Sequence, residues 1–236
     1  MRLMLRFRPL ENFSFDEVCK HTIQGLIYSA LRESGYGEIH DSPKFKFFCF
    51  SDIFPSTDFN ENEVKNLIIS SPDPNFITTL YKSLKEKRDL RLNTYKIKIE
   101  EMKKFYINLK NRFISGSPIV LYKDNKRNIY YSFRRDGDLN FFLNRLKDNA
   151  LKKYNIYYSD DYYLEGNIFD NLEFKKEVAV RNFKGGKEFI VIGNVWSLLE
   201  KKEIKKDERK FYSFIMECGL GEKNSMGFGF INPIRD

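Results

Sequence analysis

The chain has 236 residues, of which 42% are hydrophobic and 16% aromatic, so it can fill a sizeable core and is not a disordered chain. Its formal net charge of +8 is compatible with a phosphate-rich partner, but charge alone is better explained by an ordinary solvated surface. The three cysteines are far apart and form no CxxC pair, which argues against a zinc site or a disulfide framework and is typical of a cytoplasmic protein. Three arginines interrupt the first ten residues and no apolar run approaches the length of a membrane span, so neither a signal peptide nor a membrane protein is expected.

The first half of the chain predicts six elements in the order βαββαβ. Alternating apolar and basic side chains predict the first strand, and Ser14 with Glu17 has the spacing of a capping box at the start of the first helix. Aromatic content and helical spacing predict the others. The expected ranges are residues 1–10, 14–34, 44–51, 64–70, 74–87 and 90–99.

The same order of elements recurs in the second half, without any repeat at the level of single residues. Two of its strands are joined through Lys184-Gly185-Gly186-Lys187, which is a hairpin signal. The expected ranges are residues 113–122, 139–154, 173–180, 188–195, 207–218 and 227–231. We therefore predict an α+β protein of two tandem ferredoxin-like (βαββαβ, RRM-like) units, with an N-terminal domain at residues 1–109 and a C-terminal domain at residues 110–236.

The first helix and the loop after it carry both histidines of the chain. On a helical wheel, the apolar residues from Ile23 to Leu31 share one arc, and His21 and Tyr28 lie on a side that faces away from the core. His40 is expected in the following loop. Lys44 is expected at the start of a strand, because Pro43 disfavours helical backbone before it. A lone loop histidine is more often a surface residue than a catalytic one.

Residues 219–229 contain four glycines, and we call this segment the glycine-rich loop. A Walker A loop is excluded, because Gly-Lys-Ser/Thr is missing. A dinucleotide fingerprint requires a strand before the glycines and a helix after them, whereas the expected order here is the reverse. A helix end followed by a kinked strand explains each glycine alone but not the whole pattern.

The sequence GEKNSMGFG in this loop resembles the C-terminal glycine-rich motif of the RAMP superfamily of CRISPR-associated RNA-binding proteins. Together with the helix sequence QGLIY, it is most similar to the repeat-RNA endoribonucleases of the Cas6 family. The resemblance implies two ferredoxin-like units and cleavage of CRISPR repeat RNA without metal or cofactor. The neighbouring 2′-hydroxyl attacks, which leaves 2′,3′-cyclic phosphate and 5′-hydroxyl ends.

The resemblance also implies catalytic roles for Tyr28, His40 and Lys44, with Lys46 as the alternative to Lys44. A histidine titrates near pH 6.5 and can serve as acid or base, and a lysine can stabilise the charge that develops on the phosphate. Tyrosine is a poor base at neutral pH, so Tyr28 is expected to position the RNA. No metal site is expected, because the acidic pair Asp160–Asp161 has no second carboxylate cluster beside it.

The expected partners are CRISPR repeat RNA and its processed form, and the resemblance leaves open an effector complex and a homodimer. The residues expected to bind RNA are in the glycine-rich loop and at the predicted hairpin: Gly219, Gly221, Lys223, Gly227, Gly229, Lys184 and Lys187. The main alternative is a non-catalytic RAMP subunit that only holds RNA in an effector complex. A second alternative is an unrelated ferredoxin-like metabolic or regulatory protein, which the glycine-rich loop disfavours.

Overall fold

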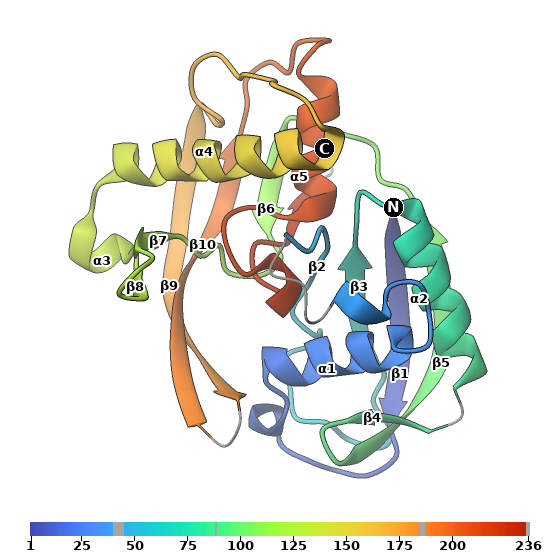
Figure 1. Cartoon of the computed structure of the whole chain (residues 1–236). Coiled ribbons are helices and arrows are strands. Elements are labelled where there is room, and N and C mark those ends of the chain that lie inside the picture. The colour runs from blue at the N-terminus through green and yellow to red at the C-terminus, as the bar shows by residue number, and fades with distance from the viewer. Residues whose placement is uncertain (40–44, 88, 185–186, 235–236) are drawn as a thin grey trace.

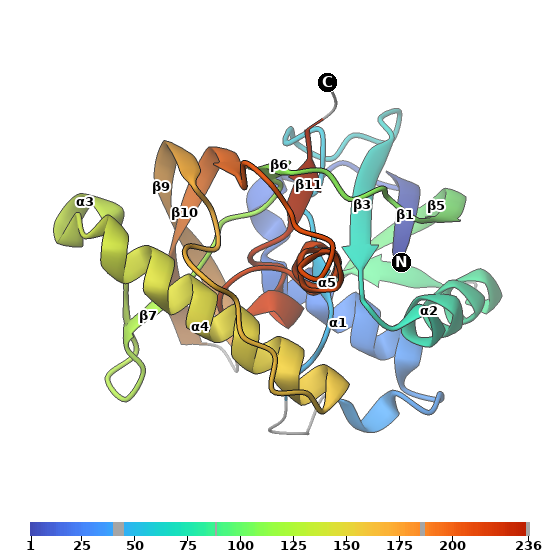
Figure 2. The same cartoon turned by 90° about the horizontal axis from the view of Figure 1, so that it is seen from above.

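The computed structural model describes residues 1–39, 45–87, 89–184 and 187–234. Two antiparallel sheets stand side by side, and each is covered by two helices (Figures 1 and 2). The first sheet contains β1 (Arg2–Pro9), β2 (Cys49–Phe50), β3 (Lys65–Ser70), β4 (Leu90–Leu92) and β5 (Tyr95–Phe105), and its helices are α1 (Lys20–Leu31) and α2 (Pro74–Glu86). The second sheet contains β6 (Arg112–Ser115), β9 (Asn171–Lys184), β10 (Lys187–Glu200) and β11 (Ile231–Pro233), and its helices are α4 (Leu139–Tyr158) and α5 (Arg209–Cys218).

The strand order of both sheets is that of a ferredoxin-like unit. The first runs β2-β3-β1-β5, with β4 as an added edge strand, and the second runs β9-β10-β6-β11. In each, the first and third strands of the unit are central and the second and fourth flank them. The predicted fold class is therefore confirmed. The sheets change between β5 and β6, and the domain bounds at residues 109 and 110 stay a prediction.

Three short elements complete the fold, together with a small hairpin of β7 (Tyr122–Asp124) and β8 (Ile129–Tyr130) followed by α3 (Phe133–Asp136). The short elements are the 3-10 helices η1 (Phe15–Glu17), η2 (Gly37–Ile39) and η3 (Asn224–Met226). The apolar side chains form two main clusters, one under each pair of helices, and Trp196 is the largest fully buried side chain. No helix in the described ranges is long and apolar enough to span a membrane.

The predicted first helix is wrong at its N-terminus. Ser14 is an N-cap, but of the three-residue η1, and the Phe15 N–H donates to Asp58 Oδ1 at 2.8 Å. The backbone is extended at Cys19, and α1 begins only at Lys20. The chain therefore forms one isolated turn followed by extended backbone before α1, and not a continuous helix from Ser14.

Two other strands are interrupted where a turn residue lies within them. Asn93 takes a positive φ of 59°, so the strand expected at 90–99 is a hairpin of β4 and β5. Gly116 lies so close to Phe230 that an added Cβ would be 2.7 Å from its ring, and the chain there leaves β6. The strand expected at 44–51 is also shorter, since only β2 pairs with β3 within its described part.

Arg2 joins the two halves of the molecule. Its side chain is 1% exposed, and its Nη2 donates to the main-chain oxygens of Met216 at 3.0 Å and Ile231 at 2.7 Å. Burial lowers the pKa of this guanidinium to about 10. Beside it, the Met1 ammonium pairs with Glu217 of α5. Since β1 belongs to the first sheet and α5 covers the second, these contacts fix one against the other.

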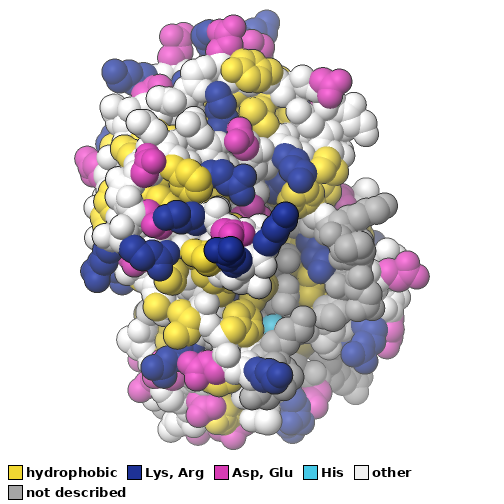
Figure 3. Space-filling view, turned by 60° about the vertical axis from the view of Figure 1, so that its left-hand side comes forward, with side chains coloured by type: hydrophobic (Ala, Val, Ile, Leu, Met, Phe, Trp, Pro, Cys, Tyr) yellow, Lys and Arg dark blue, Asp and Glu magenta, His cyan; other side chains and the backbone are white. Residues whose placement is uncertain are grey.

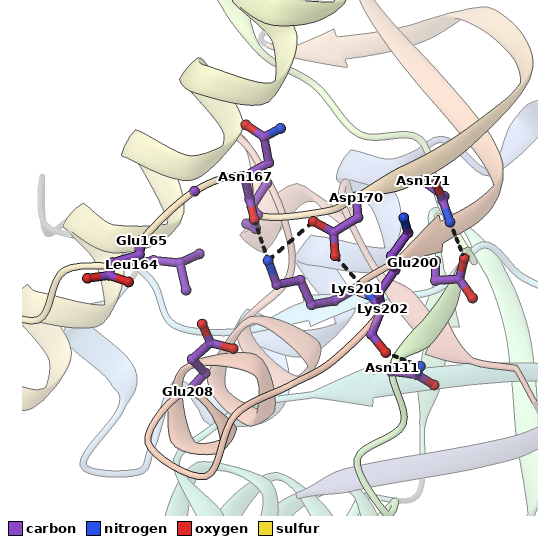
Figure 4. A network of polar contacts seen from close by, with 12 residues as sticks. Asn111, Leu164, Glu165, Asn167, Asp170, Asn171, Glu200, Lys201, Lys202 and Glu208 are labelled. Atoms are coloured by element: carbon purple, nitrogen blue, oxygen red, sulfur yellow. Dashed lines mark hydrogen bonds and ion pairs between the residues drawn. The ribbon is translucent and has the colours of Figure 1, made fainter.

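A polar network closes one end of the second sheet (Figure 4). Lys201 Nζ donates to Asn167 O at 3.0 Å, and the Lys201 N–H donates to Asn111 O at 2.8 Å. Asp170 Oδ2 accepts from the Lys202 N–H at 2.9 Å. These bonds tie the start of β9 to the end of β10 and anchor the two long strands at their base. The opposite end of the same two strands reaches α1 (Figure 1).

Candidate nucleic-acid interface and catalytic site

The glycine-rich loop returns from the end of α5 to β11 and lies between the two halves. All four of its glycines have positive φ, as does Lys223 at 58°. A Cβ at Gly227 would lie 2.0 Å from the Phe50 ring, and one at Gly229 would lie 1.8 Å from Leu220 O. Glycine is therefore required for this loop to pack, because any side chain would collide with the first sheet or with the loop itself.

The glycines themselves are buried, and the partly exposed residues of the loop lie between Glu222 and Met226. The N–H of Gly229 donates to Pro118 O at 2.8 Å, and that of Glu222 donates to Val120 O at 2.7 Å. These bonds attach the loop to the chain after β6. The final strand was expected at residues 227–231, and this position is wrong. The strand β11 starts only at Ile231, after Gly227 and Gly229, which both have positive φ.

Lys153 of α4 lies inside the curve of this loop. Its side chain is 2% exposed, and its ammonium donates to Gly219 O at 2.8 Å, Gly221 O at 3.0 Å and Asn224 Oδ1 at 2.7 Å. Burial lowers the pKa of this ammonium below its ordinary value. One positive charge thus holds three oxygens of the loop together.

The first helix presents a polar row to the same loop. Lys20, Gln24 and Tyr28 lie four residues apart on α1, which places them on one face, and we call them the loop-facing row. Lys20 Nζ donates to Gly227 O at 2.7 Å, and Gln24 Nε2 donates to Ser225 O at 2.9 Å. Lys20 also pairs with Asp52. The row fixes the glycine-rich loop, which belongs to the second half of the chain, against a helix of the first.

Tyr28 packs against the core, so the expectation that it faces away from the core is wrong. Its ring meets Phe48 edge to face with centroids 6.0 Å apart, and Lys46 Nζ lies 5.9 Å from its centroid. Burial raises the pKa of the phenol, whereas hydrogen bonding by the side chains of Ser225 and Gln24 lowers it by a smaller amount. The raised pKa favours a phenol that donates a hydrogen bond over a base.

His21 precedes Tyr28 by two helical turns on α1 and meets a different environment. It lines a cavity of about 670 Å³ with Cys19, Lys87 and Phe183, between α1 and the hairpin of β9 and β10. The side of α1 that the sequence assigned to both residues therefore lines this cavity at His21 and packs against the core at Tyr28. His40 and Lys44 lie outside the described residues.

The hairpin signal is confirmed, since Lys184 pairs with Lys187 at the last described positions of β9 and β10. Lys223 lies apart from this tip, in the glycine-rich loop, with its ammonium 5.5 Å from the Tyr122 ring and 5.8 Å from the Tyr130 ring. Lys and Arg side chains gather across the middle of the face in Figure 3, with Asp and Glu between them. Within the described ranges, no three His, Cys, Asp or Glu side chains are grouped so as to hold a metal ion.

Residues 100–233 match the family model for the C-terminal part of CRISPR associated protein Cas6. The chain belongs to the Cas6 family. It is 54% identical over 241 residues to the CRISPR-associated endoribonuclease Cas6 2 of Methanocaldococcus jannaschii, with both chains covered in full. It is 19% identical to the CRISPR-associated endoribonuclease Cas6 of Haloferax mediterranei, over 99% of this chain and 94% of the relative.

Solved structures share the fold of this Cas6-family protein. A CRISPR associated protein Cas6 superposes with a TM-score of 0.73 at 24% identity, covering 100% of this chain and 99% of the other. A RAMP protein described as binding different RNA substrates superposes with a TM-score of 0.73 at 18% identity, covering both chains in full. The resemblance to the RAMP superfamily and to its Cas6 branch is therefore confirmed.

The sequence did not indicate four residues of this region: Lys20, Gln24, Lys153 and Ser225. The spacing of Lys20, Gln24 and Tyr28 is a signal for a shared helix face, and it could have been noticed. Lys153 gave no such signal, because its partners are 66 to 71 residues away in sequence.

Proposed function

We propose that this Cas6-family protein is a metal-independent endoribonuclease that cuts CRISPR repeat RNA at a specific position. The 2′-hydroxyl next to the cut attacks the phosphate, and the products carry 2′,3′-cyclic phosphate and 5′-hydroxyl ends. Membership of a family whose relatives are named endoribonucleases supports the reaction. The RAMP structure that binds RNA substrates supports RNA as the ligand.

The observation that carries this proposal is the place of Lys46 beside the Tyr28 ring, on the side of α1 where Gln24 donates to Ser225 O and the two halves of the protein touch. Tyr28 comes from α1, Ser225 from the glycine-rich loop and Lys46 from the segment before β2. A phenol, a hydroxyl and an ammonium suit a phosphate, because all three can donate hydrogen bonds and the ammonium adds positive charge.

In this mechanism, His40 exchanges the protons of the reaction. It removes the proton from the 2′-oxygen or delivers one to the departing 5′-oxygen, and both tasks suit an imidazole near neutral pH. Tyr28 donates a hydrogen bond that positions the phosphate, consistent with the raised pKa of its phenol. A lysine stabilises the negative charge of the phosphorane. Lys46 is supported by its place beside the Tyr28 ring, and Lys44 remains the alternative.

We further propose that RNA is held by Lys223 and by the hairpin tip with Lys184 and Lys187. Because the glycines are buried, their proposed contribution is to give the loop its shape, and Lys223 and Ser225 would make the contacts. The repeat RNA and its product are the proposed partners, in the cytoplasm. An effector complex and a homodimer are further assemblies that we propose for this protein.

The test is incubation of the protein with the repeat RNA of its host in EDTA, followed by analysis of the fragment ends. Cleavage should persist and give 2′,3′-cyclic phosphate. A substrate with deoxyribose at the cut position should bind and stay uncut, because its nucleophile is missing. Strict dependence on added magnesium would contradict the mechanism. Tight binding of the all-ribose substrate without cleavage would instead indicate a non-catalytic RNA-binding subunit.

A further inference from the structure

Two tyrosines stack at the base of the small hairpin of β7 and β8, which belongs to neither of the two large sheets. Tyr122 and Tyr130 are partners in the strand pairing, and their ring centroids lie 5.0 Å apart with 25° between the planes. Tyr122 is 9% exposed, whereas Tyr130 is only half-buried. We call the two rings the tyrosine pair. Tyr122 supports it from the inside, and Tyr130 gives it an accessible surface.

The tyrosine pair lies beside both elements that are proposed to hold RNA. The ammonium of Lys223, in the glycine-rich loop, is 5.5 Å from the Tyr122 ring and 5.8 Å from the Tyr130 ring. Tyr130 also packs against a small apolar cluster that includes Val191 of β10, the strand that starts at Lys187 of the hairpin tip. The pair therefore connects the glycine-rich loop with the strand that leads from the tip.

The segment around the tyrosine pair is positively charged. Residues 122–136, which include the hairpin and α3, contain five Lys or Arg and two Asp. Both carboxylates are already paired, Asp136 with Lys123 at 2.7 Å and Asp124 with Arg127 at 3.7 Å. This part of the molecule is at the left of Figure 1 and comes forward in Figure 3, where Lys and Arg side chains gather across the middle of the face. An excess of cations around an aromatic pair suits a ligand that carries phosphates.

The composition of this surface favours RNA over a protein partner. Ile129, at 38%, is the one large apolar side chain of residues 122–136 that is strongly exposed, and a docked protein would need a larger apolar patch. An unpaired base needs only one accessible ring on which to stack. A base within a duplex already stacks on its neighbours, so the site suits a single-stranded part of the RNA.

We propose that the tyrosine pair is a stacking platform for one unpaired nucleotide of the RNA, with the Lys223 ammonium beside the phosphate of that nucleotide. The inference rests on the proposed function, because it takes the RNA ligand from there. Every base has a π face, so the platform should hold the RNA without selecting its sequence. Tyr130 binds RNA in this scheme and takes no part in the chemical step. Its loss should raise the Kd for RNA and leave the cleavage rate at saturating protein unchanged.

The affinity of three variants for repeat RNA tests the platform. Tyr130→Leu keeps an apolar side chain against the cluster but removes the ring, and it should weaken binding by about 5- to 150-fold. Tyr130→Phe keeps the ring and should bind within ~2-fold of the wild type. Tyr163→Leu is the matched control and should bind like the wild type, since Tyr163 is 68% exposed and the Lys147 ammonium lies 5.2 Å from its ring.

A second measurement changes the RNA and does not depend on the folding of a variant. Single abasic nucleotides are placed in turn along the unpaired parts of the repeat RNA. At one position, the missing base should weaken binding to the wild type by a factor similar to that of Tyr130→Leu. The same abasic RNA should lose less than ~2-fold in affinity for Tyr130→Leu, because base and ring belong to one contact.

Normal RNA affinity of Tyr130→Leu would overturn the proposal, and so would equal losses in Tyr130→Leu and Tyr130→Phe. Abasic effects that are the same in the wild type and in Tyr130→Leu at every position would overturn it as well. These results leave cleavage by the wild type intact and the proposed function standing. A wild-type protein that binds the RNA through Tyr130 but does not cut it would instead refute the proposed cleavage and support the platform.

Discussion

Replacing Lys153 by methionine should destabilise the protein, because it removes a buried ammonium that donates to three oxygens of the glycine-rich loop. Methionine fills a similar volume but cannot donate a hydrogen bond. Three oxygens would lose the donor that lies 2.7 to 3.0 Å away, namely Gly219 O, Gly221 O and Asn224 Oδ1. The loop would be left with buried acceptors that have no partner from α4.

The size of the effect follows from two opposing contributions. A buried polar group without a partner costs about 1–3 kcal/mol, so three acceptors would cost roughly 3–9 kcal/mol if none relaxed. Against this, the variant no longer has to bury an ammonium, a penalty of several kcal/mol that already lowers the pKa of Lys153. We expect a net loss of about 2–4 kcal/mol in the free energy of unfolding. For a chain of this size, that lowers Tm by about 4–16 °C.

Thermal and chemical unfolding of Lys153→Met should be compared with unfolding of Lys152→Met. Lys152 is the neighbouring residue on α4 but is exposed, so its replacement should change stability by less than ~0.5 kcal/mol. Equal or greater stability of Lys153→Met would refute the reasoning. It would show that burying the ammonium costs more than its three hydrogen bonds return, and that the loop keeps its shape without it.

Three further predictions concern the proposed catalysis, RNA binding and acid stability. His40→Ala should slow single-turnover cleavage by roughly 10²–10⁴-fold with little change in RNA affinity, while His21→Ala should cut at nearly the wild-type rate; a dead His21→Ala beside an active His40→Ala would reverse the assignment. Replacing Lys184 and Lys187 together by Ala should weaken RNA binding and reduce its dependence on log salt by up to ~2 units of slope, and an unchanged slope would remove the hairpin tip from the RNA path. Burial raises the pKa of Asp136, but hydrogen bonds from Lys123 and the Ser132 N–H outweigh it and hold that pKa below its ordinary value. The carboxylate therefore stabilises the fold at neutral pH and loses this effect as pH falls below ~4, so Asp136→Asn should flatten the acid side of the stability profile; parallel profiles would contradict this.

Hydrophobic periodicity was sufficient to predict the fold class, because each ferredoxin-like unit depends on the order of its elements and on which faces are apolar. The arc from Ile23 to Leu31 on α1 is buried as expected. The ends of elements were predicted less well, since tertiary contacts decide them. Extended backbone at Cys19 separates η1 from α1, and β6 ends at Ser115, just before Gly116 packs closely against Phe230.

The contacts of the candidate site were harder to predict, because they join segments that only the folded chain brings together. Ser225 meets Gln24 across 201 residues, and no local pattern contains that pairing. The helical wheel placed Tyr28 with His21, because their angles on the wheel are similar. The glycine-rich loop covers the Tyr28 side of α1, and that covering surface cannot be read from the periodicity of the helix.

The packing of the glycine-rich loop also decides which substitutions can test RNA binding. Gly227 and Gly229 have positive φ, and a Cβ on either would overlap Phe50 or Leu220 O. A substitution there strains the fold and displaces the loop, so a loss of RNA binding would not distinguish a missing contact from a misplaced one. Lys223 is partly exposed, and its ammonium lies over the Tyr122 and Tyr130 rings. Replacement of Lys223 by methionine therefore separates the charge of the loop from its shape, and RNA binding that stays unchanged in that variant would remove the Lys223 charge from the RNA path.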